Sequence, residues 1–113
     1  MAFSEIELYK IKSFVGALCN MRAPESIRDQ LRYEYAIEKY DVILSEVRPR
    51  WDKPDEYTRM PVAKLKFIRS RNIWKLYWHR ANGKWYPYEQ FESRDLEDLI
   101  IEIDDDPYGC FFG

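Results

Sequence analysis

Few residues of this chain belong to the types that commonly carry out catalysis. His79 is the only histidine, and Cys19 and Cys110 are the only cysteines. A zinc site needs several ligands at a defined spacing, and the sequence contains neither a Cys-x-x-Cys nor a His-Glu-x-x-His motif. A cysteine nucleophile needs an adjacent base, and only His79 could approach Cys110 in the folded chain. We therefore predict no enzymatic activity, no catalytic residue, no metal ion and no cofactor.

Acidic residues cluster near the end of the chain, at Glu102 and at residues 104–106. Their carboxylates could hold a hard cation, but their spacing is not that of a calcium-binding loop. The alternative is a solvated acidic helix end. Negative charge is unfavourable there, and we expect basic side chains of the sheet to compensate for it.

Basic and aromatic residues in the middle of the chain are better suited to binding. Residues 48–84 contain eleven Lys or Arg against three Asp or Glu, and residues 89–106 contain one Arg against nine acids, although the net charge is only -2. Lysine and arginine attract phosphates or carboxylates, and aromatic rings offer stacking surfaces. The candidate binding residues are Arg48, Arg50, Trp51, Lys64, Lys66, Lys75, Tyr77, His79, Tyr86 and Tyr88.

Two helices are predicted before the basic region. Ser4 and Glu7 match a capping box, and the helix that they begin should end near residues 19–20. Its apolar stripe consists of Leu8, Ile11, Val15 and Leu18. Pro24 suits the first turn of a second, short helix over residues 25–31.

A five-strand antiparallel meander is predicted next. β-rich segments separated by polar breaks indicate strands near residues 32–38, 41–49, 61–69, 73–80 and 84–88. The stretch between residues 48 and 60 holds two prolines and no sustained periodicity, and we expect a loop there.

Two turns predict the register of the last three strands. A turn at residues 69–72 gives the opposite pairs Ile68–Ile73, Phe67–Trp74, Leu65–Leu76 and Ala63–Trp78. A type I′ turn at Asn82-Gly83 gives the pairs Arg80–Trp85, His79–Tyr86, Trp78–Pro87 and Tyr77–Tyr88. The apolar face then holds Leu65, Phe67, Trp74, Leu76 and Trp78. The opposite face holds Lys64, Lys66, Lys75, Tyr77, His79, Tyr86 and Tyr88. We expect all helices to cover the apolar face.

A last helix should follow Ser93, which we expect to cap it. Its apolar positions are Leu96, Leu99, Ile100 and Ile103, and Pro107 and Gly109 should stop it. The terminal residues 108–113 are apolar, and they either dock into the core or insert into a second subunit or partner.

The chain as a whole is predicted to be one α+β domain over residues 1–113. At 113 residues it has room for one core, and no run of about 20 apolar residues could cross a bilayer. The N-terminus lacks a signal-peptide pattern, so we expect a cytoplasmic protein whose cysteines stay reduced.

Five separated segments carry a family resemblance. They are IRDQL at 27–31, VRPRWD at 47–52, PVAK at 61–64, IWKLYW at 73–78 and YGCFFG at 108–113. In this order they resemble the bacterial family named domain of unknown function 3024, over nearly the whole chain. The resemblance implies a bacterial origin and a stand-alone domain, and it assigns no catalytic residue.

These observations favour a binding domain that contacts no membrane. The first hypothesis is recognition of a protein partner, self-association included, through Arg48, Arg50, Trp51 and the exposed sheet. The second is binding of single-stranded nucleic acid by the lysines and tyrosines, although a pI near 5.5 argues against a strongly basic binder. The remaining alternative is a solvated face. Lys66 lies opposite Lys75 in the predicted register, and two like charges so placed repel each other. We therefore expect an anion nearby, either a phosphate or a carboxylate of the last helix.

Overall fold

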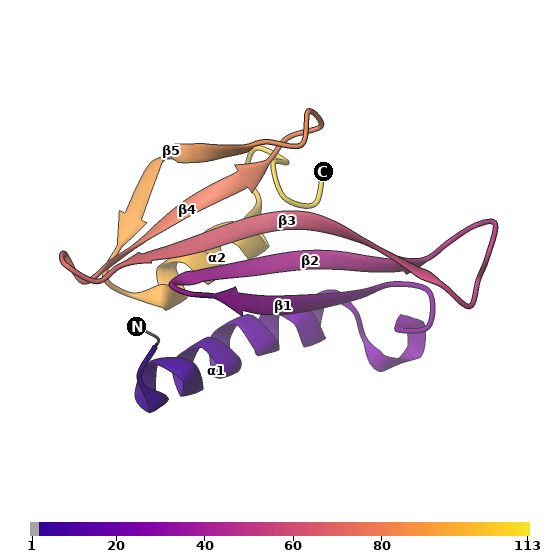
Figure 1. Cartoon of the computed structure of the whole chain (residues 1–113), viewed down its shortest axis with the longest axis horizontal. Helices are drawn as coiled ribbons and strands as arrows, with labels where there is room; N and C mark the ends of the chain where they lie inside the picture. Colours follow the sequence, from indigo (N-terminus) through magenta and orange to yellow (C-terminus); the bar gives the residue numbers. More distant parts are fainter. Residues whose placement is uncertain (1–2) are drawn as a thin grey trace.

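Five antiparallel strands and two helices form an α+β structure in the computed structural model, which describes residues 3–113 (Figure 1). The elements are α1 (Glu5–Arg22), a 3₁₀ turn (Glu25–Ile27), β1 (Arg32–Glu38), β2 (Asp41–Pro49), β3 (Tyr57–Ile68), β4 (Ile73–His79), β5 (Trp85–Ser93) and α2 (Leu96–Asp105). Neither helix of the described residues is long and apolar enough to cross a membrane.

Helix α1 begins with the predicted capping box. The Ser4 hydroxyl accepts a hydrogen bond from the Glu7 amide at 3.2 Å, and the Glu7 carboxylate accepts one from the Ser4 amide at 2.8 Å. The helix ends at Arg22, two residues beyond the predicted end. Leu8 is 41% exposed, so the predicted apolar stripe is wrong at its first position.

The predicted second helix is only a 3₁₀ turn, so the expectation of two N-terminal helices is wrong. The turn contains no fully buried residue. A short helix gains most of its stability from packing an apolar face, and the apolar side chains of this segment, Ile27 and Leu31, are only half-buried. The Arg28 side chain instead donates to the Ala23 carbonyl at 2.8 Å and turns the chain back toward α1.

The strands form one meander in the order β1-β2-β3-β4-β5, as predicted. The long loop predicted between residues 48 and 60 is shorter, because Arg48 pairs with Thr58 and Pro49 pairs with Tyr57. Strand β3 therefore begins at Tyr57. The connection that remains, residues 50–56, lies at the tip of the long β2–β3 hairpin (Figure 1).

The register predicted from the first turn is confirmed, and the register predicted from the second is wrong by one residue. All four predicted β3–β4 pairs are present. Between β4 and β5 the observed pairs are His79–Trp85, Trp78–Tyr86 and Tyr77–Pro87. The turn has three residues, since the Arg80 amide donates to the Lys84 carbonyl at 3.0 Å. Only Gly83, at φ +82°, adopts the left-handed conformation that a type I′ turn requires at both central positions.

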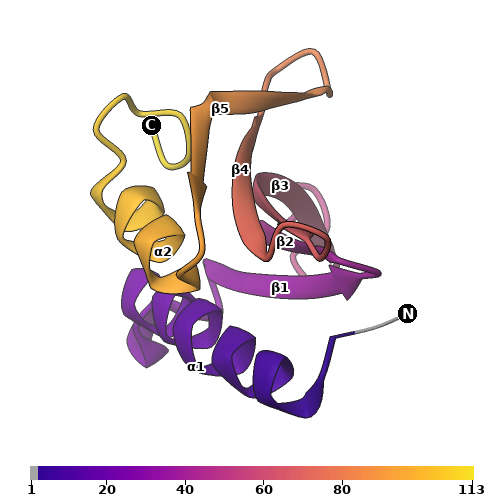
Figure 2. The ribbon, with the colours of Figure 1, turned by 90° about the vertical axis from the view of Figure 1, so that its left-hand side faces the viewer.

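Strand β5 changes direction at Glu89 and Gln90, whose φ angles are 48° and 60°. Beyond this bulge the pairing continues as Lys75–Glu92 and Trp74–Ser93. Figure 2 shows the bend that results, which carries the second half of β5 toward α2. Bulges of this kind bend a strand and change which face its side chains meet.

Both helices lie on the same side of the sheet, against the face predicted to be apolar (Figure 2). The buried residues of that face are Leu65, Phe67, Trp74 and Leu76. Asp95, rather than Ser93, is the N-cap of α2, and the Ser93 hydroxyl accepts from the Asp95 amide and donates to Asp98. Asp104 near the end of α2 pairs with Arg22 of α1 at 3.2 Å, so the compensating cation comes from a helix and not from the sheet.

The C-terminal segment docks into the core, which is the first of the two predicted alternatives. Phe111 is buried, and the Phe112 ring meets the Tyr33 ring edge to face at 5.4 Å. The Asp106 carboxylate accepts from the Phe111 and Phe112 amides at 3.1 and 2.8 Å. These bonds fold the tail back onto the end of α2.

Candidate binding surface

The sheet face opposite the helices carries five of the ten predicted binding residues, and we call it the outer face. Strand β3 supplies Lys64 and Lys66, and β4 supplies Lys75, Tyr77 and His79, because side chains alternate along each strand. The register places Lys64 opposite Tyr77 and Lys66 opposite Lys75, as predicted.

Trp85 joins this face and completes an aromatic–lysine cluster of Lys64, Tyr77, His79 and Trp85. The His79 and Trp85 rings lie edge to face, with centroids 5.0 Å apart. The Lys64 ammonium lies 5.2 Å from the centre of the Tyr77 ring and 5.1 Å from that of Trp85. Two electron-rich rings thus hold one ammonium group on the sheet surface. The predicted register paired Trp85 with Arg80 instead of His79, and Trp85 was not among the candidate binding residues.

Tyr86 and Tyr88, predicted on the outer face, point to the other side. Tyr86 lies opposite Trp78, and the Arg80 guanidinium stacks over both rings at 4.6 and 4.8 Å. Tyr88 is 2% exposed, and its hydroxyl donates to Glu102 of α2 at 2.5 Å. Burial, together with this bond, raises the pKa of Tyr88 far above its usual value. The one-residue register shift turns both tyrosines inward.

Acidic residues of neighbouring strands flank the opposed lysines Lys66 and Lys75. Across the sheet, Asp41 of β2 lies opposite Lys66, and Glu92 of β5 lies opposite Lys75. The Lys75 ammonium is 4.0 Å from the Glu92 carboxylate, which Arg71 also approaches at 3.3 Å. The anion that relieves the repulsion is therefore a carboxylate of the sheet, and not one of the last helix.

A second charged group lies on the outer face nearer the β2–β3 loop. Glu34 accepts from Arg59 at 2.5 Å and from Arg32 at 3.1 Å, and the Arg32 guanidinium lies 4.6 Å from the centre of the Tyr57 ring. Arg59, followed by Arg32, holds the pKa of Glu34 below its usual range. Alternation along β3 makes Tyr57, Arg59, Lys64 and Lys66 one strip, on either side of a bulge near Pro61. Sequence reasoning missed this group because its members come from β1 and β3, which are far apart in the sequence.

The loop of residues 50–56, which we call the Trp51 loop, lies at the end of this strip. Arg50 donates to both oxygens of Asp52 at 3.0 and 2.8 Å, and to Glu56 at 3.0 Å. The Arg50 amide donates to the Glu56 carbonyl at 2.8 Å and closes the loop. Arg48 pairs with Glu46. The predicted arginines are thus engaged with neighbouring carboxylates, while Trp51 projects into solvent at 94% exposure.

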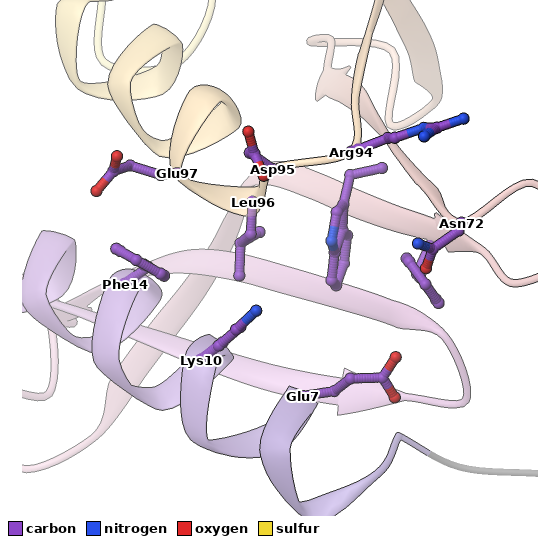
Figure 3. A pocket seen from close by; sticks show the side chains of 10 residues that line it. Glu7, Lys10, Phe14, Asn72, Arg94, Asp95, Leu96 and Glu97 are labelled. Carbon is purple, nitrogen blue, oxygen red and sulfur yellow. The ribbon is translucent and has the colours of Figure 1, made fainter.

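A cavity of about 440 Å³ lies between α1, the β3–β4 turn and the start of α2 (Figure 3). Its floor includes Phe14, Phe67, Trp74 and Leu96. Its rim carries charges of both signs, at Glu7, Lys10, Arg94, Asp95 and Glu97. Such a rim selects neither anions nor cations. Sequence reasoning missed the cavity because three elements far apart in the chain form it.

His79, Cys19 and Cys110 are the residues of this chain whose types are best suited to catalysis or metal binding. Over residues 3–113, no three His, Cys, Asp or Glu side chains gather as a metal ion would require. His79 and Cys110 line one cavity of about 370 Å³. Burial raises the pKa of the Cys110 thiol, and it raises that of Cys19 to about 11. A reactive cysteine needs the opposite shift, because the thiolate is the nucleophile.

Comparison with known proteins places the chain in a family. The family model described as Domain of unknown function (DUF3024) matches residues 3–113. The chain belongs to this family. The match covers every element of the DUF3024 fold described above, the outer face and the Trp51 loop included. No curated protein and no solved structure matches the chain.

Proposed function

We propose that this DUF3024 domain is a non-enzymatic recognition module, which binds a protein partner through the outer face and the Trp51 loop. The observation that carries the proposal is the exposure of Trp51 on a loop that two ion pairs of Arg50 hold closed. An aromatic side chain on an ordered loop gives up little conformational entropy on binding, and tryptophan is enriched among binding hot spots.

The charge pattern beside Trp51 supports a protein partner over a polyanion. Each of four arginines of this region already pairs with a carboxylate; they are Arg32, Arg48, Arg50 and Arg59. A nucleic acid backbone would have to displace these carboxylates. A protein surface with charges of both signs can instead complement the alternating pattern.

The proposed setting is the cytoplasm of a bacterium. In that reducing compartment the thiols of Cys19 and Cys110, both free in the structure, would remain unoxidised.

Binding measurements on Trp51→Ala test the proposal. The partner is captured from a lysate of the source organism on immobilised wild-type domain, then purified and titrated by calorimetry. Loss of a hot-spot tryptophan should weaken the complex by about 30-fold, or about 2 kcal/mol. Ile101→Ala, which removes an exposed apolar side chain from α2, is the control and should bind like the wild type. Equal affinity of Trp51→Ala and wild type, or no protein retained by the wild type, would contradict the proposal.

Single-stranded nucleic acid is the second candidate ligand, and the aromatic–lysine cluster favours it. Lys64 between Tyr77 and Trp85 offers a cation beside rings on which unpaired bases could stack. Fluorescence anisotropy with random single strands should then show binding that falls steeply with added salt and weakens in Trp85→Ala. Absence of binding at low salt would remove this candidate.

A further inference from the structure

The two edges of the sheet differ in their protection against pairing with another strand. The β5 edge contains Pro87 and the bulge at Glu89 and Gln90. Prolines and bulges prevent an edge strand from pairing with a strand of another molecule. The β1 edge has neither, and all seven of its residues pair with β2 in unbroken register. Within residues 3–113 no strand pairs with the other side of β1. This edge can accept a strand.

A groove of about 610 Å³ runs beside the β1 edge, between that strand and α1. Small residues of α1, namely Ser13, Gly16 and Ala17, lie in one wall, which Lys12, Cys19 and Asn20 complete. Residues 33–35 of β1 form the other wall. A Cβ atom added at Gly16 would meet nothing within 4 Å, so this wall is open. The groove leaves room for a further backbone next to β1.

Helix α1, which runs alongside β1 in Figure 1, presents an uncharged stripe on its solvent side. The stripe consists of Ile6, Tyr9, Ser13, Gly16, Ala17 and Asn20, at helical spacing. Ile6 and Tyr9 are 72% and 71% exposed. Solvent-facing stripes of helices are normally charged, so this one has the composition of a surface covered by another protein.

We propose that a second copy of the chain occupies this edge, with the two β1 strands antiparallel and centred on Tyr35. The two sheets then become continuous. A two-fold axis through Tyr35 places Arg32 opposite the partner's Glu38, and Tyr33 opposite the partner's Ile37. Both helices α1 lie on one side of the joint sheet, where the small residues of their stripes allow close approach.

Charge complementarity between Glu38 and the partner's Arg32 favours a second copy of the chain as the occupant of this edge. In the single chain Glu38 lies opposite Asp41, a like-charge pair, and no Lys or Arg of residues 3–113 forms an ion pair with Glu38. The partner's Arg32 supplies the missing cation on the open side of Glu38.

The two neighbouring two-fold registers do not match charges in this way. Moving the strands by two residues in one direction places Glu34 opposite the partner's Glu34, and in the other direction opposite the partner's Glu38. The Tyr35-centred register is therefore the one that pairs the full strand without opposing carboxylates.

Sedimentation velocity across a concentration series, on wild type and on Glu38→Arg and Arg32→Glu variants, tests the proposal. The wild type should dimerise. Each variant alone opposes like charges at both symmetric contacts, and its dissociation constant should rise by about tenfold or more. An equimolar mixture of the two variants restores both oppositely charged pairs and should form heterodimers.

Glu97→Arg, which reverses a charge on α2, is the matched control and should dimerise like the wild type. Circular dichroism of each variant separates loss of dimer from loss of fold, and Glu38→Arg leaves the Arg32–Glu34 pair of the single chain in place. A wild type that stays monomeric at high micromolar concentration would overturn the proposal. So would a folded Glu38→Arg variant that dimerises like the wild type, or a mixture that dimerises no better than its components.

Discussion

Glu7 belongs to two interactions that join the start of α1 to the sheet. Besides its bond to the Ser4 amide, its carboxylate accepts from both terminal nitrogens of Arg69, at 2.7 and 2.8 Å. Arg69 is the main cause of the lowered pKa of Glu7, with the Ser4 bonds adding to it. The folded state thus prefers the ionised carboxylate.

We expect Glu7→Gln to lower the free energy of unfolding by about 1 kcal/mol at neutral pH, through loss of the ion pair and weakening of the cap. Because the pKa is lower in the folded state, this stability is present above the unfolded value near 4.5 and is lost as the pH falls through the folded pKa. Urea unfolding of both proteins at several pH values measures the difference. It should shrink in acid, and a difference that stays constant down to pH about 2 would contradict the assignment.

Residues that sequence reasoning placed correctly are those whose partners are fixed locally. Ser4 and Glu7 are three positions apart, so their cap follows from helix geometry alone. Tyr88 was placed wrongly because its side depends on the β4–β5 register and because a tyrosine suits either face. The bond of its hydroxyl to Glu102 explains how it can be buried, and the sequence contains no local signal for that bond.

At the scale of elements, the two hairpins that end at β4 and β5 show what a turn sequence can determine. The β3–β4 register was predictable because apolar residues face each other at every second pair. Asn82-Gly83 allows both a two-residue and a three-residue turn, and the β4–β5 registers that these two turns produce differ by one residue. The outer-face lysines were therefore placed correctly, whereas Tyr86 and Tyr88 were assigned to the wrong face.

The turn after β4 yields a prediction about Gly83. Gly83→Ala should destabilise the fold by about 1 kcal/mol, because alanine is disfavoured at φ +82° even though its Cβ would meet nothing within 4 Å. Ala81→Gly in the same turn is the control for a general change in turn flexibility. Thermal unfolding followed by circular dichroism measures both, and a Gly83→Ala variant as stable as the wild type would contradict the left-handed conformation.

The bulge of β5 yields the opposite prediction, that introducing a glycine stabilises the fold. Gln90, at φ 60°, is a non-glycine residue in the left-handed region, so Gln90→Gly should relieve strain and raise the unfolding free energy by up to about 1 kcal/mol. Glu92→Gly, at a regular position of the same strand, should be destabilising. A loss of stability in Gln90→Gly would show that its side chain matters more than its backbone conformation.

On the scale of the whole molecule, the C-terminal segment joins α1 to α2. Arg22 of α1 pairs with Asp104 of α2, and its guanidinium lies 3.8 Å from the centre of the Phe112 ring. Phe111 packs on the Tyr88 ring at 5.0 Å, within the same core as α1 and the sheet. Docking of this segment was one of two sequence-based alternatives, and nothing in the local sequence could decide between them, since both bury the same apolar side chains.

Phe111→Ala should therefore lower the unfolding free energy by about 3 kcal/mol, through lost burial and the cavity left behind. Tyr108→Ala, at an exposed position of the same segment, should cost much less. Differential scanning calorimetry measures both midpoints. Equal midpoints for the two variants would mean that the tail does not belong to the cooperative core.

Among the four tryptophans, Trp51 and Trp74 are the extremes of exposure, and they give the molecule two contrasting optical reporters. Trp74 is 6% exposed and Trp51 is 94% exposed, so iodide in solution should quench emission from Trp51 and leave Trp74 almost untouched. A ligand that covers the β2–β3 tip would shield its indole from the quencher without shifting the emission of the buried one. Unfolding would do the opposite, so steady-state fluorescence can distinguish occupancy from denaturation without any added label.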